Sequence, residues 1–181
     1  MNVKIKLDLD ITTKLKEIRN RVAESNLVTL EMKSFSGGQV RESIDISKWL
    51  YNEMVLKEKL FREYLENHKW EEYENKFVAI HCSHDVIVPI WAYMLVTKYL
   101  KPYTNHIVFG DQKSLENKIF EINIEALDLK KFKDKRVLIK GCTDTYIPEK
   151  SYVQISNKLI GVVKSLMFGE ACSNVPIYKS N

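Results

Sequence analysis

An apolar run, a glycine, a cysteine and a proline follow one another in Val137-Leu138-Ile139-Lys140-Gly141-Cys142-Thr143-Asp144-Thr145-Tyr146-Ile147-Pro148. The apolar residues predict a β-strand, and the polar residues after them predict a loop. The proline indicates the first position of a helix, where a backbone N–H has no partner to lose. This segment therefore predicts the order strand, loop, helix.

Two other segments repeat the order of an apolar run, a cysteine and a proline, although the first of them lacks the glycine. One runs from Phe77 to Pro89 and contains Cys82, and the other runs from Ser165 to Pro176 and contains Cys172. Every cysteine of the chain thus follows an apolar run and precedes Ser or Thr. We therefore expect this pattern to have a structural or chemical cause.

Strands and helices are expected to alternate through the second half of the chain, a pattern typical of a parallel sheet with crossover helices. The expected strands cover residues 77–81, 106–109, 136–140 and 165–168, and the expected helices cover residues 89–100, 114–127 and 148–163. The sequence therefore predicts an α/β fold with three layers and a mostly parallel sheet.

The first half predicts a helix over residues 13–25, then a β-hairpin whose strands cover residues 27–35 and 40–46. Ser36-Gly37-Gly38-Gln39 has the composition of the turn between them. Residues 1–12 form either an edge strand or an extension. We expect residues 1–181 to form a single α/β domain.

Composition excludes several classes of protein. With 45% hydrophobic and 29% charged residues the chain is typical of a globular protein, and a net charge of +4 gives no reason to expect nucleic acid as a partner. Its longest apolar stretch is too short to span a membrane, and its beginning is unlike a signal peptide, so a cytoplasmic location is expected. The nucleotide-binding and hydrolase motifs GxxxxGK[ST], GxGxxG, HExxH and GxSxG are absent.

Parallel strands deliver their following residues to one edge of a sheet, the carboxyl edge, where ligands bind. Cys82, Cys142 and Cys172 are expected to meet there, with His84 or Asp85 as a further ligand. Thiolates with such partners favour zinc or an iron–sulfur cluster. The leading hypothesis is therefore a metal-binding protein, accessory to metal or cluster metabolism.

Other hypotheses use the same residues. A thiolate or a metal-activated water would make the protein an enzyme, with Asp85, Asp144 or Glu170 as acid–base groups. The third alternative is a non-catalytic interaction protein in which the cysteines are inert and fill the core.

Glycines near the expected edge would let the backbone approach a cofactor closely. Gly110 and Gly141 are the candidates, and Asp111 is either a ligand or a helix cap. The helix around residues 90–96 is apolar on all sides, which predicts that it is either buried or part of a homodimer interface.

Several segments together resemble a bacterial family classified as domain of unknown function 2480. They are Arg21–Ser25, Asp45–Leu50, Cys82–Ser83, Pro89–Tyr93, Val108–Asp111, Lys140–Cys142, Gly169–Ser173 and Val175–Lys179. The similarity extends from about Glu17 to the end of the chain. The resemblance implies no activity and no established site residues, but it implies an association with iron–sulfur cluster assembly and its proteins as partners.

Overall fold

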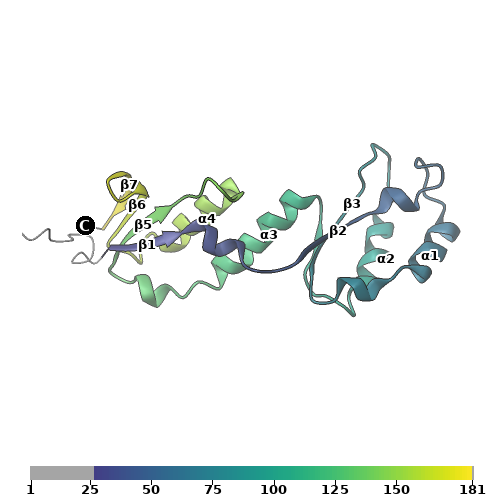
Figure 1. The fold of residues 1–181 in the computed structure, drawn as a ribbon, viewed down its shortest axis with the longest axis horizontal. Helices are drawn as coiled ribbons and strands as arrows, with labels where there is room; N and C mark the ends of the chain where they lie inside the picture. Colours follow the sequence, from purple (N-terminus) through teal and green to yellow (C-terminus); the bar gives the residue numbers. More distant parts are fainter. Residues whose placement is uncertain (1–26, 181) are drawn as a thin grey trace, which may run out of the picture.

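A computed structural model describes residues 27–180 of the chain. It contains two mostly parallel sheets and four α-helices, so the predicted α/β class is confirmed. In Figure 1 the two sheets lie toward opposite ends of an elongated molecule, and helix α3 lies between them. The helix expected over residues 13–25 and the extension over residues 1–12 lie outside the described residues.

The four-stranded sheet has the order β1-β5-β6-β7. Its strands are β1 (Leu27–Glu31), β5 (Arg136–Lys140), β6 (Ser165–Glu170) and β7 (Ser173–Lys179). The first three strands run parallel, and β7 runs antiparallel to β6.

The three-stranded sheet is parallel throughout, with the order β2-β3-β4. Its strands are β2 (Arg41–Asp45), β3 (Phe77–His81) and β4 (Ile107–Phe109). The α-helices are α1 (Glu58–Asn67), α2 (Ile90–Leu100), α3 (Gln112–Glu125) and α4 (Glu149–Leu159). Four 3₁₀ helices complete the elements, namely η1 (Met32–Ser36), η2 (Ile46–Trp49), η3 (Trp70–Tyr73) and η4 (Leu129–Phe132).

The predicted hairpin and the predicted single sheet are both wrong. Strand β1 pairs with β5, whereas β2 pairs with β3 in the other sheet. The reason lies in η1, which buries Met32 and Phe35 immediately after β1 and carries the chain away from it. Gly37, with φ of 60°, bends the backbone, but the bend connects two sheets rather than two paired strands.

The two sheets are built on one plan, because the elements from α1 to β4 recur 59 positions later as the elements from α3 to β6, while β1 and η1 correspond to β2 and η2. Pro89 and Pro148 each precede a crossover helix. Gly110, directly after β4, and Gly169, near the end of β6, have φ of 123° and 126°. The offset indicates that the chain contains two copies of one structural unit.

One copy is inserted into the other. Residues 41–109, from β2 to β4, form what we call the inserted unit. The split unit consists of residues 27–36, which hold β1 and η1, and residues 112–180, which run from α3 through β7. Because the first strand of the split unit comes before the whole inserted unit, neighbouring strands in the sequence lie in different sheets.

Helix α3 has a role in both units. Phe120 and Ile124 pack in the core of the split unit, with η1, β5 and α4. Leu115 and Ile119 instead pack against β3 of the inserted unit. The helix therefore joins the two cores.

Candidate functional site

The carboxyl ends of the parallel strands β1, β5 and β6 open into a cleft with a volume of about 720 Å³. We call it the edge cleft. Its lining residues come from the ends of these strands, from η1, from the loop after β5 and from α4, and they are Glu31, Lys33, Lys140, Gly141, Cys142, Thr143, Asp144, Tyr152, Phe168, Gly169 and Glu170.

An ion pair occupies the edge cleft. The ammonium group of Lys140, at the end of β5, lies 3.1 Å from a carboxylate oxygen of Glu170, at the end of β6. Hydrogen bonding and attraction to Glu170 raise the pKa of Lys140, and Glu31 adds to this effect. The cleft therefore holds a permanent cation between carboxylates.

Two aromatic side chains form the apolar part of the cleft. The ring of Tyr152, from α4, meets the ring of Phe168 edge to face, with centroids 5.6 Å apart. A Cβ atom at position 141 would lie 3.2 Å from the Tyr152 hydroxyl, so Gly141 leaves room for that hydroxyl beside the loop. Burial raises the pKa of Tyr152, and a charge on the nearby sulfur of Cys142 acts in the same direction.

Cys142 follows Gly141 in the loop after β5 and is half-buried. A negative charge on its sulfur raises the pKa of both Lys140 and Tyr152, which places the thiol within electrostatic reach of both side chains. A nearby cation stabilises a thiolate, the form of cysteine that acts as nucleophile and metal ligand.

The equivalent edge of the inserted unit is closed by its own hydrogen bonds. Asp45, at the end of β2, accepts hydrogen bonds from the backbone N–H groups of Ser47 and Ser83, both at 3.0 Å. Ser83 Oγ also lies 3.1 Å from Ser47 Oγ and 3.4 Å from His84 Nδ1. These contacts tie the loop after β3 to the end of β2.

The structure separates the cysteines that were expected to meet at one edge of one sheet. Cys82 follows β3 of the inserted unit, where its thiol donates to the His84 carbonyl at 3.6 Å. Cys142 follows β5, and Cys172 lies exposed in the turn between β6 and β7 of the split unit. The expectation of a single shared edge is therefore wrong, because Cys82 follows a strand of one sheet whereas Cys142 and Cys172 belong to the other.

Among residues 27–180, no three His, Cys, Asp or Glu side chains are grouped closely enough to hold a metal ion. Cys82 also occupies the position of Gly141 in the other copy, and Cys142 occupies that of Ser83. The cysteines are thus not equivalent residues of the repeated unit.

The other predicted site residues have varied positions. Gly141, Asp144 and Glu170 line the edge cleft. Asp111 caps α3, accepting hydrogen bonds from the Ser114 N–H and hydroxyl at 3.0 and 2.9 Å, and these bonds lower its pKa.

Of the remaining predicted residues, His84 and Asp85 belong to the inserted unit, and Gly110 directly follows it. Gly110 supplies the positive φ between β4 and α3. His84 and Asp85 are exposed in the loop after β3, with His84 Nε2 3.5 Å from Glu53. They therefore lie apart from the edge cleft.

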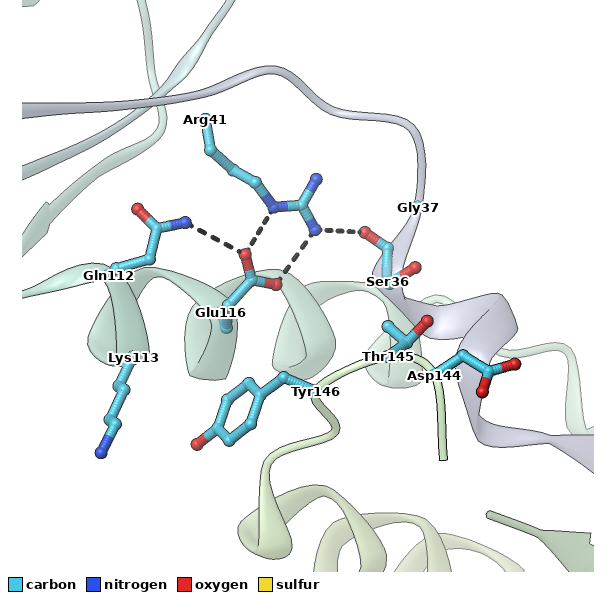
Figure 2. A pocket seen from close by; sticks show the side chains of 9 residues that line it. All are labelled: Ser36, Gly37, Arg41, Gln112, Lys113, Glu116, Asp144, Thr145 and Tyr146. Carbon is cyan, nitrogen blue, oxygen red and sulfur yellow. Dashed lines mark hydrogen bonds and ion pairs between the residues drawn. The ribbon is translucent and has the colours of Figure 1, made fainter. Parts of the chain in front are cut away.

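A second cleft of about 690 Å³, which shares Asp144 with the edge cleft, is shown in Figure 2. Arg41 and Glu116 form an ion pair in it, with Nη2 3.0 Å from Oε2. Arg41 also donates to the carbonyl groups of Gln39 and Ser36. Because the guanidinium is largely used by the protein itself, this cleft is poorly suited to bind an anion.

Sequence reasoning missed five residues of the edge cleft, because their charges and rings follow no known motif. They are Glu31, Lys33, Lys140, Tyr152 and Phe168. A signal was present in the offset of 59 positions, which aligns Tyr93 with Tyr152 and Phe109 with Phe168. In the inserted unit, the rings of Tyr93 and Phe109 also meet edge to face, with centroids 4.9 Å apart.

Fold and cleft together define an α/β protein with a ligand-sized cleft at the carboxyl edge of a parallel sheet, the usual position of a binding site in such folds. The chain belongs to the family described as "Protein of unknown function (DUF2480)", whose family model matches residues 16–180. No curated protein and no solved structure matches the chain. None of the helices within residues 27–180 is long and apolar enough to cross a membrane.

Proposed function

We propose that the protein binds a small polar molecule in the edge cleft and that the thiolate of Cys142 attacks an electrophilic carbon of that molecule. The observation that carries this proposal is the position of Cys142, half-buried in the cleft beside the Lys140–Glu170 ion pair. Cysteine nucleophiles are found in partly exposed positions beside a cationic side chain.

The remaining groups of the cleft supply the proton transfers. Asp144 and Glu170 are the carboxylates that can take up the thiol proton. A sulfur–carbon bond then forms, and the leaving group departs with the electron pair and receives that proton. Tyr152 and Phe168 offer an apolar surface to the body of the molecule.

Binding of zinc or an iron–sulfur cluster stays a prediction, but we no longer propose one ion shared by Cys82, Cys142 and Cys172, because Cys82 belongs to the other sheet. Elemental analysis of freshly purified protein tests metal binding directly. Zinc or iron in stoichiometric amount would favour metal chemistry over the thiol nucleophile.

Alkylation of the full chain with iodoacetamide tests the proposal, with the three sites followed by peptide mass spectrometry. We expect Cys142 to react faster than Cys172, although Cys172 is the more exposed. If the rates simply follow exposure, the cleft does not activate Cys142 and the proposal fails.

A charge variant tests whether the edge cleft causes the faster alkylation of Cys142. Lys140→Met is expected to slow alkylation of Cys142 by roughly fivefold, because the reacting thiolate loses a nearby cation. Lys164→Met is the matched control, since Lys164 is an exposed lysine that does not line the edge cleft. Equal rates in both variants would contradict a role for Lys140.

A further inference from the structure

Strand β4 forms one end of the three-stranded sheet and exposes backbone groups on its outer side. The His106 carbonyl accepts from Val78 N–H, and Gly110 N–H donates to the Ile80 carbonyl. Because bonding alternates along a strand, the N–H and C=O groups between these positions that point away from β3 are those of Ile107 and Phe109. Exposed edges of this kind are templates for a further strand.

The two copies of the unit differ at this edge. The counterpart of β4 is β6, and β7 pairs with β6 on its outer side. Within residues 27–180, no strand occupies the corresponding side of β4. The inserted unit therefore leaves open a position that the split unit fills with an antiparallel strand.

An apolar surface lies beside this edge. Ile90 and Met94 of α2 are 70% and 66% exposed, and Phe109 of β4 is 69% exposed. Together with Tyr93 and Thr97 they line a groove of about 480 Å³. Exposed apolar surface next to an open strand edge is typical of a protein interface.

We propose that two copies of the chain associate through β4, antiparallel, with Val108 on the two-fold axis. In that register the outward N–H and C=O groups of Ile107 meet those of the partner subunit's Phe109, and the reverse pairing follows by symmetry. The apolar side chains of α2 from both copies would then come together over the joined sheet. This inference is independent of the proposed thiol chemistry.

Charge supports the antiparallel direction. Lys101 Nζ donates to Asn105 Oδ1 at 2.6 Å, just before β4, and Asp111 follows β4. The proposed register places Asn105 opposite the partner subunit's Asp111, so the ammonium group of Lys101 approaches that carboxylate. Parallel pairing would instead bring like charges together.

Symmetry favours a second copy over other occupants. A contact of β4 with itself uses the same surface on both subunits and closes after two copies. A contact between β4 and the outer edge of β7 would not close and would build a filament.

A disulfide at the axis tests the register. Residues facing each other outside the hydrogen-bonded pairs have Cα atoms about 4.5 Å apart, which suits a disulfide. Val108→Cys is therefore expected to form a covalent dimer under mild oxidation. Met167→Cys is the matched control, because Met167 is the counterpart of Val108 but pairs with Pro176 of β7. Equal cross-linking in both variants and in the unchanged chain would overturn the register.

The mass in solution, measured by light scattering over a range of concentrations, tests the association itself. The full chain is expected to reach twice its 21.2 kDa, Met94→Lys to remain at the mass of one chain, and Val153→Lys to behave as the full chain. Val153 is the counterpart of Met94 and is similarly exposed, at 71%.

Two outcomes of this measurement would overturn the proposal. One is a full chain that stays monomeric at every concentration. The other is a dimer that is lost when residues 1–24 are removed, because the contact would then depend on that segment rather than on β4.

Discussion

A single carboxylate distinguishes the two carboxyl edges. Asp45 binds two backbone N–H groups and closes the edge of the inserted unit, whereas its counterpart Glu31 lines the open edge cleft. Burial by itself would raise the pKa of Asp45, but the hydrogen bonds from Ser83 and Ser47 outweigh it and hold the pKa well below its usual range. The carboxylate is therefore ionised wherever the protein is folded near neutral pH.

Replacing this carboxylate should destabilise the protein in a pH-dependent way. Asp45→Ala is expected to lower the free energy of unfolding by about 1–2 kcal/mol at pH 7, since two N–H groups lose their acceptor. A carboxylate whose pKa is lower in the folded than in the unfolded state stabilises the folded protein at pH values above the unfolded-state pKa of about 3.9. This contribution is lost as the pH falls below that value. The difference between variant and parent should thus be constant from pH 7 to about pH 5 and shrink below pH 4.

Urea unfolding at a series of pH values measures this difference. Glu31→Ala is the matched control and should change the free energy of unfolding by less than about 0.5 kcal/mol, as expected for an exposed side chain. A pH-independent loss in Asp45→Ala would contradict the role of the ionised carboxylate.

Among the helices, α3 carries the connection between the two units. Its first turns pack against the inserted unit and its later turns against the split unit. The ion pair between Glu116 of α3 and Arg41 of β2 reinforces this connection, and both side chains are largely buried, at 14% and 23% exposed. Hydrogen bonding to Glu116 raises the pKa of Arg41, which is a cation in any case.

Replacing Arg41 should destabilise the folded protein. Arg41→Ala is expected to lower the free energy of unfolding by about 1–3 kcal/mol, because Glu116 and two backbone carbonyls lose their donor. Arg62→Ala is the control, since its pair with Glu58 is half exposed and should contribute less than about 0.5 kcal/mol. Thermal unfolding of the two variants side by side measures both values, and equal losses would show that the pair has no special role.

In the whole molecule, the insertion of one unit into the other raises the question of how many units unfold independently. All three tryptophans, Trp49, Trp70 and Trp91, lie in the inserted unit. Their fluorescence therefore reports on that unit, whereas far-ultraviolet circular dichroism reports on the helices of both.

A core variant in the split unit tests the expectation of a single domain. Phe120→Ala removes a fully buried ring and should cost about 3–5 kcal/mol. Because α3 packs in both cores, we expect the tryptophan transition in urea to shift to lower concentration together with the dichroism transition. Phe61→Ala, its counterpart in the inserted unit, is the comparison. A tryptophan transition unaffected by Phe120→Ala would mean that the inserted unit unfolds as a separate domain.

Local patterns were reliable guides to the elements. The apolar runs at Phe77–His81 and Arg136–Lys140 are strands with the predicted bounds, and the prolines 89 and 148 directly precede helices. These features depend on neighbouring residues, through side-chain periodicity and the missing N–H of proline. The positions of Cys142, Asp144 and Glu170 near a carboxyl edge followed from the same local rules.

The amino-acid pattern was sufficient for the class of fold, the elements and the thiol at the end of a buried strand. The amino-acid pattern did not predict the strand pairing. Strand β1 pairs with β5, more than a hundred residues away, while β2, the next strand along the chain, pairs in another sheet. Whether two strand ends share an edge depends on such long-range pairing, in which apolar strands are nearly interchangeable. Cys82 was therefore separated from Cys142, and Lys140 was brought to Glu170, by packing that involves the whole chain.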